Sequence, residues 1–144
     1  MFSKACEYGI KATIFIAKNS TTETRVNLKK ISVAIDSPEA FTAKILQLLV
    51  KNKIISSEKG ASGGFTIPHD KLGTISLAAI VNAIDGDKIY KGCGLGLEIC
   101  NELKPCPMHE KFKIVRDGLR EMLENTTVSE LASGLDIGIT FLKR

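Results

Sequence analysis

Apolar positions recur at helical spacing along the N-terminal part of the chain. Residues 2–18 place small or apolar side chains on one face, which predicts an amphipathic helix. Asn27 is a typical N-cap for a short second helix whose inward face carries Leu28, Ile31 and Ile35. The chain is therefore predicted to begin with two amphipathic helices.

A third helix is predicted over about residues 38–52. Ser37 can cap its N-terminus, and Pro38 suits the first helical position. Two helices joined by a tight turn, the second opening with small polar side chains, form the outline of a helix-turn-helix. The predicted buried face of the third helix follows the spacing i, i+4, i+7 and i+8 and consists of Phe41, Ile45, Leu48 and Leu49.

Two short strands follow the third helix. The segments 54–58 and 65–67 have strand character, and the glycine-rich stretch 59–64 between them is typical of a hairpin tip. A helix-turn-helix followed directly by such a hairpin is a winged helix. With a fourth helix beginning near residue 74, residues 1–86 are predicted to form a winged helix-turn-helix domain, mainly α with a small β-wing.

The C-terminal part of the chain contains a long charged helix, predicted over about residues 108–125. The stretch Thr127–Glu130 has the form of a capping box and starts a short last helix. The predicted divisions are therefore a loop at 87–107, two helices within 108–133, and a tail at 134–144 that is expected to fray. The apolar face of the long helix carries Phe112, Val115, Leu119 and Met122.

Composition and charge bound the class of protein. With 144 residues, of which 44% are hydrophobic, the chain can form one domain with its own core. It has no apolar run long enough for a membrane span and no signal-peptide pattern, so we expect a cytoplasmic protein without a membrane partner. The net charge of +4 permits nucleic-acid binding without proving it. No nucleophile-base pair or phosphate loop is visible, so the chain is not predicted to be an enzyme.

The candidate chemistry lies in the loop after the fourth helix. Cys93, Cys100 and Cys106, three of the four cysteines, fall with His109 into a short, glycine- and proline-rich stretch. Thiolates and an imidazole are a ligand set for zinc or for an iron-sulfur cluster. In a reducing compartment, clustered cysteines indicate metal binding or redox sensing before structural disulfides. The residues alone leave open an iron-sulfur cluster, a structural zinc site, a thiol-based switch and simply buried cysteines.

Four segments carry a resemblance to a known family over about residues 1–131. The chain resembles the bacterial winged-helix transcription regulators that include the iron-sulfur cluster regulator IscR and the nitric-oxide-sensing repressor NsrR. The wing followed by the cysteine loop is the most specific part of this pattern. The four segments are Lys4–Lys11, Ser37–Leu49, Ser57–Phe65 and the three-cysteine loop that follows Ile75–Val81.

The resemblance implies a homodimer in which the long helix after the cysteine loop pairs with its mate. It also implies an iron-sulfur cluster, 2Fe-2S or 4Fe-4S, whose state changes the affinity for double-stranded DNA. Family members differ in the fourth ligand: His109 matches one arrangement, and Glu7 of the partner subunit matches the position of the other. The chain departs from the commoner family spacing, since six residues rather than five separate Cys93 from Cys100. A glycine-rich loop is expected to absorb the extra residue.

DNA contacts are expected at two places. Glycines make the wing tip slim enough to enter a minor groove, with Lys59, Ser62 and Gly63 as the contacting residues. The start of the third helix is placed to meet base edges in the major groove and, through a lysine, phosphates. These helix residues are Ser37, Pro38, Glu39, Thr42, Ala43 and, for the phosphates, Lys44.

We therefore expect a DNA-binding transcriptional regulator, with repression as its output. It would sense nitric oxide, redox state or iron-sulfur status through a cluster held by the three clustered cysteines. Two alternatives stay open. One is a cluster-free winged-helix regulator switched by thiol oxidation or a small ligand, and the other is a winged-helix interaction module stabilised by zinc.

Overall fold

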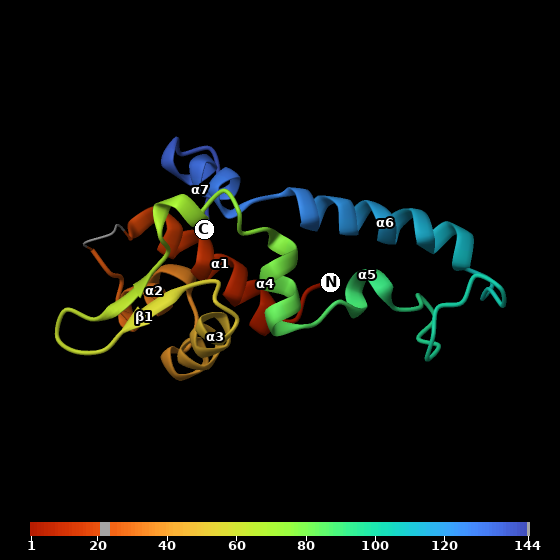
Figure 1. Cartoon of the computed structure of the whole chain (residues 1–144), viewed down its shortest axis with the longest axis horizontal. Helices are drawn as coiled ribbons and strands as arrows, with labels where there is room; N and C mark the ends of the chain where they lie inside the picture. The colour runs from red at the N-terminus through yellow and green to blue at the C-terminus, as the bar shows by residue number, and fades with distance from the viewer. Residues whose placement is uncertain (21–23, 144) are drawn as a thin grey trace.

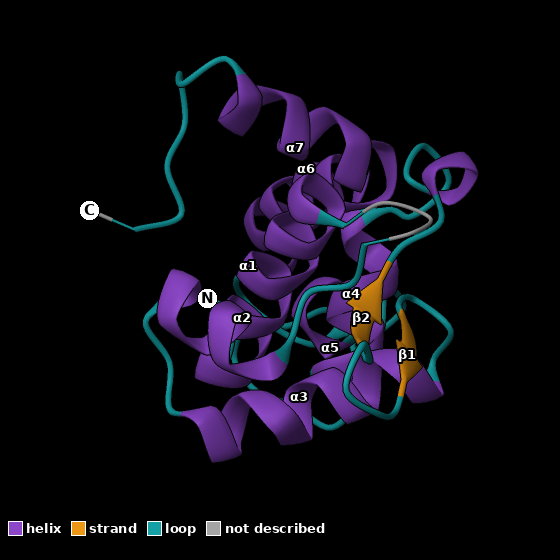
Figure 2. Cartoon of the chain, turned by 90° about the vertical axis from the view of Figure 1, so that its left-hand side faces the viewer, coloured by secondary structure: helices purple, strands orange, loops and turns teal. Residues whose placement is uncertain are grey.

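The chain folds into a helical body that carries a small wing at one end and a projecting arm at the other (Figure 1, Figure 2). The computed structural model describes residues 1–20 and 24–143. This architecture is the predicted, mainly α fold with a small β-wing. In chain order the elements are α1 (Lys4–Asn19), α2 (Leu28–Ile35), α3 (Glu39–Lys51), β1 (Ser56–Glu58), β2 (Gly64–Thr66), a 3-10 turn (His69–Lys71), α4 (Leu77–Ile84), α5 (Lys88–Lys91), α6 (His109–Asn125) and α7 (Val128–Asp136).

Side-chain caps begin the first two helices. Ser3 Oγ accepts a hydrogen bond from the backbone N–H of Cys6 at 3.0 Å. Asn27 Oδ1 accepts one from the backbone N–H of Lys30 at 2.9 Å, so the N-cap predicted for the second helix is confirmed. Asp36 is the C-cap of α2, and its φ of 54° turns the chain into α3.

The buried face of α3 differs from the predicted one. Phe41 and Leu48, both predicted to point inward, are 37% and 39% exposed. Thr42 is fully buried instead, and its Oγ1 donates to the carbonyl of Pro38 at 2.9 Å, which satisfies the hydroxyl inside the core. The core side of α3 consists of Thr42, Ile45, Leu46 and Leu49.

Ser37 does not cap α3, so that prediction is wrong. The N-cap position is occupied by Pro38, which makes no side-chain capping bond. The hydroxyl of Ser37 contacts the hydroxyl of Thr42, and its backbone N–H donates to the carbonyl of Ser32 at 3.0 Å. Ser37 therefore stabilises the turn between the two helices rather than the end of α3.

The wing is an antiparallel hairpin anchored at its base. β1 pairs with β2, and Val26 adds an isolated bridge in which its N–H donates to the carbonyl of Phe65 at 2.9 Å. Gly64 has a φ of 143°, and a Cβ at this position would lie 2.7 Å from the Val26 carbonyl oxygen. Arg25 Nη2 lies 2.6 Å from Glu58 Oε1. These contacts fix the strands and leave the glycine-rich tip at the periphery.

The core lies where α1, α2, α3 and α4 meet. Cys6 is buried there among apolar side chains, as predicted for a small residue at a helix interface. Burial, reinforced by the nearby Asp85 carboxylate, raises the pKa of the Cys6 thiol to about 12. The largest fully buried aliphatic side chains include Ile16, Ile31, Ile35, Ile45, Leu46, Leu49 and Ile80.

Among the described residues, no helix has the length and apolar character needed to cross a bilayer.

Residues 87–125 form the arm. It contains α5, an irregular stretch of residues 92–108 that we call the cysteine segment, and α6. Figure 1 shows the cysteine segment at the far end of α6, while the wing lies at the opposite end of the long axis. α6 agrees with the predicted helix over 108–125 to within one residue.

The base of the arm is fixed to the body at two points. Leu123, near the end of α6, is fully buried in the core. The N–H of Leu77 donates to the carbonyl of Thr126 at 2.9 Å, and the N–H of Val128 donates to the carbonyl of Ile75 at 2.9 Å. These two bonds join the starts of α4 and α7.

The last helix begins as predicted and runs further than predicted. Thr127 Oγ1 accepts a hydrogen bond from the N–H of Glu130 at 3.3 Å, which is the capping contact expected from the sequence. α7 continues to Asp136, beyond the predicted start of the tail. Lys18 Nζ donates to the carbonyl of Leu135 at 3.3 Å, so the end of α7 is joined to the end of α1.

Candidate functional site

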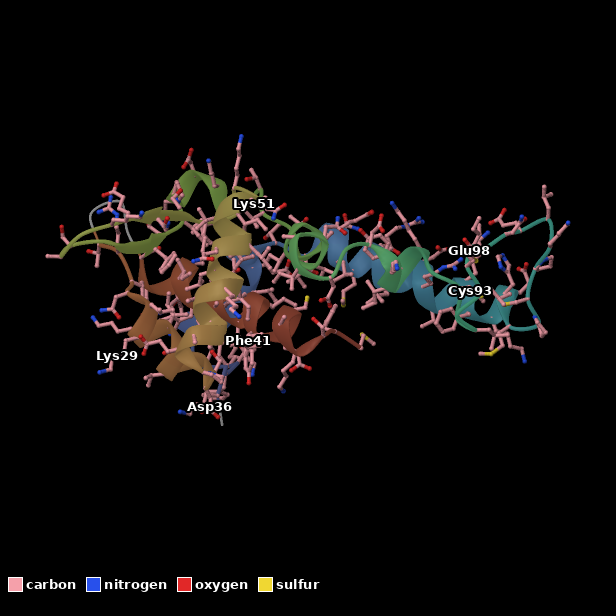
Figure 3. The ribbon with its side chains drawn as sticks, turned by 90° about the horizontal axis from the view of Figure 1, so that it is seen from below. Lys29, Asp36, Phe41, Lys51, Cys93 and Glu98 are labelled. Carbon is pink, nitrogen blue, oxygen red and sulfur yellow. The ribbon has the colours of Figure 1, made fainter. Side chains whose placement is uncertain are left out.

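The cysteine segment lies far from α3 in the body (Figure 3). Figure 3 shows Cys93 at one end of the molecule and Phe41 and Lys51 of α3 in the body. The segment is held between the end of α5 and the start of α6, which pack against each other. A change at the segment must therefore reach the body through the arm.

The predicted ligands other than Glu7 form two pairs. The Sγ atoms of Cys93 and Cys106 lie 3.8 Å apart, and Cys100 Sγ lies 3.5 Å from His109 Nδ1. Within the part of the chain that the structure describes, no three histidine, cysteine, aspartate or glutamate side chains converge closely enough to hold one metal ion. The sequence thus predicted residues that are neighbours in space, but the two pairs do not form a single set of ligands.

His109 is buried, although it begins a charged helix. It is only 4% exposed and occupies the first position of α6. Its Nδ1 faces Cys100, and its buried Nε2 has no hydrogen-bond partner among the described residues. Because buried polar atoms are normally satisfied, this imidazole needs an explanation that an exposed histidine would not.

Arg116 joins α6 to two points of the cysteine segment, a role that was not predicted from the sequence. Its Nη1 donates to Cys100 Sγ at 2.9 Å and to the carbonyl of Gly92 at 2.8 Å. The bond to the Cys100 sulfur raises the pKa of the guanidinium. The helical spacing of His109, Phe112 and Arg116 was the available signal, since it places all three on one face of α6.

The first cysteine of the segment lies in a polar backbone environment. Hydrogen bonds from the backbone of Leu95 and Leu97 hold the pKa of the Cys93 thiol below its ordinary value. Gly94 packs on the ring of Phe112, because a Cβ there would lie 2.7 Å from ring atoms. The glycine therefore brings the segment close to the face of α6 that carries His109.

Glu7 lies in the first turn of α1. Figure 1 shows α1 in the body and the cysteine segment at the far end of the arm. Its carboxylate accepts a hydrogen bond from Lys4 Nζ at 2.9 Å. This bond lowers the pKa of the Glu7 carboxyl. Within one chain, Glu7 is therefore engaged with a lysine rather than with the predicted ligands.

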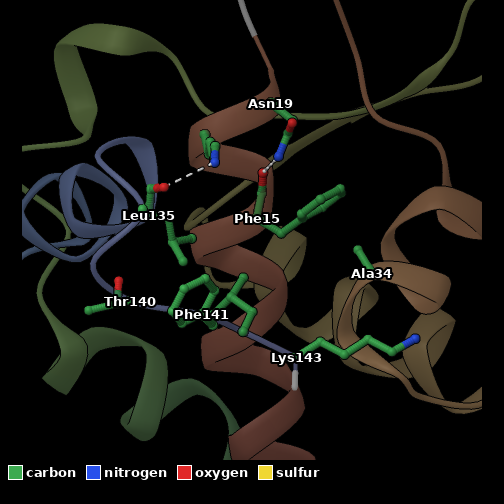
Figure 4. A pocket seen from close by; sticks show the side chains of 10 residues that line it. Phe15, Asn19, Ala34, Leu135, Thr140, Phe141 and Lys143 are labelled. Carbon is green, nitrogen blue, oxygen red and sulfur yellow. Dashed lines mark hydrogen bonds between the residues drawn. The ribbon is translucent and has the colours of Figure 1, made fainter.

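A cavity of about 470 Å³ adjoins the Cys100 and His109 pair. Its lining carries more positive than negative side chains, including Lys91, Lys113, Arg116 and Arg120. Another cavity, of about 360 Å³, lies between α1, α2 and the C-terminal segment and is lined by Phe15, Ala34, Leu135 and Phe141 (Figure 4). It shares no residue with the cysteine segment.

The predicted DNA-contacting residues of α3 differ in their exposure. Pro38, Glu39 and Lys44 are exposed, whereas Ser37 and Ala43 are half-buried. Thr42 is the exception, since its buried hydroxyl is already bonded to the Pro38 carbonyl. The prediction that Thr42 meets a base edge is therefore corrected: this side chain supports the helix start from inside.

The wing tip presents polar and charged side chains. Lys59 and Ser62 are exposed, and the N–H of Gly63 donates to the carbonyl of Gly60 at 3.0 Å to close the turn. A Cβ on Gly63 would lie 2.3 Å from the carbonyl oxygen of Glu58, so only glycine fits there without rearrangement. The tip is narrow for this reason.

Comparison with known proteins settles the family. The Rrf2 family model, described as an iron-dependent transcriptional regulator, matches residues 2–134. The chain belongs to the Rrf2 family. It is similar to a candidate HTH-type transcriptional regulator of Aquifex aeolicus, with 26% identity over 133 residues that cover 91% of this chain and 90% of the relative. It is also similar to IscR of Enterobacter sp. strain 638, with 27% identity over 130 residues that cover 90% and 78% of the two chains.

Solved structures of Rrf2 regulators have the same fold. CymR, the global cysteine regulator of B. subtilis, superposes with a TM-score of 0.76 and 25% identity, over 92% of this chain and 96% of CymR. IscR of T. potens superposes with a TM-score of 0.73 and 18% identity, over 97% and 92%. The predicted winged-helix fold is thus confirmed. The Rrf2 chain is a transcriptional regulator, and the prediction that it is not an enzyme is also confirmed.

Proposed function

We propose that this Rrf2 regulator is a homodimer that binds double-stranded DNA and responds to an iron-sulfur cluster. The cluster would be held by Cys93, Cys100 and Cys106, with His109 as the fourth ligand. The observation that carries the proposal is the buried imidazole of His109, whose Nδ1 lies 3.5 Å from Cys100 Sγ and whose Nε2 lacks a partner among the described residues.

The donor set fits such a cluster. Thiolates are the usual ligands of 2Fe-2S and 4Fe-4S clusters, and histidine replaces cysteine in some. Arg116 supplies a positive charge beside Cys100, and backbone groups near Leu95 stabilise negative charge on Cys93. When bound, the cluster would supply a centre that reacts with nitric oxide or oxidants and whose presence follows iron-sulfur supply.

His109 is favoured over Glu7 of the partner subunit as the fourth ligand. His109 is already beside Cys100 in the same chain, and its burial has no other account. Glu7 is satisfied by Lys4. Recruiting Glu7 would require this ion pair to break and the partner chain to approach, whereas His109 already lies beside one of the cysteine ligands in its own chain.

The dimer would form through the outer face of α6. Ile114 is 76% exposed, Val115 63% and Met122 46%, although all three are apolar. Gly118 lies on the same face, and a Cβ there would meet nothing within 4 Å. A glycine in mid-helix costs about 1 kcal/mol relative to alanine, so its presence is best explained by a second helix crossing closely at this point.

The two faces of α6 would couple the cluster to the dimer. One face carries His109, Phe112 and Arg116 toward the cysteine segment, and the other carries Ile114 and Val115 outward. Loading or loss of the cluster would shift the segment and tilt α6 through its first face. The second face would pass this tilt to the partner, changing the relative position of the two winged helices.

DNA would be contacted by α3 and the wing. Glu39 is exposed at the start of α3, where a carboxylate can accept from cytosine N4 yet repels phosphate, so it favours selectivity over affinity. Lys44 on α3 and Lys59 and Ser62 on the wing are exposed and suited to phosphates and groove edges. The relatives named as HTH-type regulators support this use of the fold.

The test is anaerobic reconstitution of the full chain with ferrous iron and sulfide. The protein should become brown, with visible absorbance and bound iron and sulfide in equal amounts. His109→Ala should lose most of this absorbance or release it quickly, and His69→Ala, at the exposed histidine of the 3-10 turn, should behave as wild type. Colourless protein with all thiols intact, or equimolar zinc without iron, would overturn the cluster assignment. Equal behaviour of the two histidine variants would remove His109 from the ligand set.

A further inference from the structure

The three cysteines of the segment differ in their contacts: two lie close to each other, and the third contacts other side chains. Cys93 Sγ and Cys106 Sγ lie 3.8 Å apart. Cys100, which lies between them in sequence, is held elsewhere. Its sulfur accepts from Arg116 Nη1 at 2.9 Å and lies 3.5 Å from His109 Nδ1.

We propose that the cluster-free protein forms one specific intramolecular disulfide, Cys93–Cys106, and leaves Cys100 as a free thiol. The inference is linked to the proposed function at one point, because a cluster and a disulfide would compete for the same sulfur atoms. It assigns a modification site to two residues that the cluster proposal treats as ligands, and it gives the cluster-free chain a defined oxidised state.

The geometry favours this pairing. The S–S bond of a disulfide is about 2.0 Å long, so the two sulfurs need to approach by about 1.8 Å. Both side chains are half-buried, so an oxidant can reach them. Cys93 stands between Gly92 and Gly94, and no element of regular secondary structure fixes either cysteine. Rotation of the Cys93 side chain therefore requires no helix or strand to break.

Pairings with Cys100 are opposed by its contacts. To reach either partner, the Cys100 sulfur would have to leave the Arg116 guanidinium, and charge-assisted hydrogen bonds of this kind are among the stronger ones. Arg116 also holds the Gly92 carbonyl at 2.8 Å, immediately before Cys93. One arginine thus keeps Cys100 in place and positions the chain at the start of the reacting pair.

Hydrogen peroxide is sufficient as the oxidant. In the first step one thiol attacks a peroxide oxygen, the O–O bond breaks, and a sulfenic acid and one water form. In the second step the other thiol attacks the sulfenic sulfur, the S–O bond breaks, and the disulfide and a second water form. The two thiols lose two electrons and two protons in total, and the peroxide is reduced to two molecules of water.

The disulfide would remove two of the three thiol ligands. A chain in this state could not take up a cluster until a dithiol reductant restored Cys93 and Cys106. The oxidised state would therefore persist after the oxidant had gone, which distinguishes it from simple loss of the cluster.

The experiment uses the full chain, reduced, freed of metal by a chelator and treated anaerobically with one equivalent of hydrogen peroxide. Free thiols are then alkylated, and the digest is mapped by mass spectrometry without reduction. The expected result is loss of two of the four thiols, with the Cys93–Cys106 cross-link predominating and Cys100 alkylated. Equal yields of the three possible pairings, a predominant pairing with Cys100, or a cross-link between chains would overturn the inference.

Variants test the cause of the selectivity. Cys100→Ser should leave the yield of the cross-link unchanged, and Cys106→Ser should abolish it. Arg116→Ala should raise the yield of pairings with Cys100 several-fold, whereas Arg120→Ala, one turn further along α6 and paired with Asp117, should not. Unchanged selectivity in Arg116→Ala would refute the positioning role of that arginine.

A second aliquot of the same reduced protein keeps the two proposals distinguishable. It is reconstituted with iron and sulfide without peroxide. If a cluster forms in this aliquot and the other aliquot contains mixed disulfide pairings, only the disulfide inference is refuted. If this aliquot stays colourless and the other contains a single Cys93–Cys106 cross-link, only the cluster proposal is refuted.

Discussion

Truncating Ile114 should weaken the proposed dimer without disturbing the fold of the chain. Ile114 lies on the outer face of α6 and is 76% exposed in the single chain. It contributes little to the core, so Ile114→Ala should leave the free energy of unfolding of the monomer almost unchanged. Any effect should fall on the contact between two copies of α6.

The size of the effect follows from the exposure. Complete burial of an aliphatic side chain is worth about 1.5 to 3 kcal/mol. With three quarters of the Ile114 side chain still available for burial, removing it should cost about 1 to 2 kcal/mol per protomer. A twofold interface contains the residue twice, so the free energy of dimer association should weaken by about 2 to 4 kcal/mol. This corresponds to a roughly 30-fold to 1,000-fold rise in the dimer Kd.

Sedimentation velocity over a wide concentration range measures this Kd. Ile137→Ala is the matched control, because Ile137 is 70% exposed but lies after α7 rather than on α6. Its Kd should equal that of wild type. The assignment of the interface to α6 fails if both variants weaken the dimer equally, or if the wild-type chain stays monomeric at every concentration.

Three further outcomes are expected. Lys59→Ala should weaken DNA binding in fluorescence anisotropy titrations. It should also lower the slope of log binding constant against log salt concentration by about 1. An equal loss of DNA affinity in Lys104→Ala, on the cysteine segment, would contradict contact by the wing. Leu123→Ala should lower the free energy of unfolding by about 2 to 5 kcal/mol in urea titrations, because Leu123 is fully buried, whereas Leu103→Ala, at a position 92% exposed, should have no such effect. The pKa of the Cys6 thiol is raised above its ordinary value of 9.0, so the thiol stays protonated at that pH. It should therefore not react with iodoacetamide near pH 9 until the chain is unfolded. Peptide mapping that shows prompt labelling of the native chain would refute its burial.

Local signals in the sequence were sufficient for most of the fold. Asn27 capped the second helix and Thr127 the last, because capping depends on neighbours within one turn. The face of α3 was misjudged, since pattern reasoning counts threonine as polar and phenylalanine as buried. Thr42 satisfies its hydroxyl on the Pro38 carbonyl and enters the core, while Phe41 turns outward against Tyr8. Such exchanges depend on packing between helices and cannot be found within a single helix.

The candidate site was predictable in its residues but not in its arrangement. The clustering of three cysteines and His109 in the sequence was enough to find it. That His109 is buried, and that Cys93 pairs with Cys106 rather than with Cys100, depends on how an irregular segment folds over α6. Arg116 is 16 residues from the cysteine it bonds, so no local pattern connects the two.

The attachment of α6 at its base makes the arm a lever with a fixed pivot. The backbone bonds of Leu77 and Val128 and the buried Leu123 hold one end, while the cysteine segment lies at the other. With 17 residues, α6 is about 25 Å long, so a 2 Å displacement at its tip corresponds to a rotation of only about 5° at the pivot. Movement is largest where the helix is free and smallest where it meets its own winged helix. In a dimer, the neighbouring subunit would therefore receive most of the displacement, and each protomer would act mainly on the DNA-binding domain of the other.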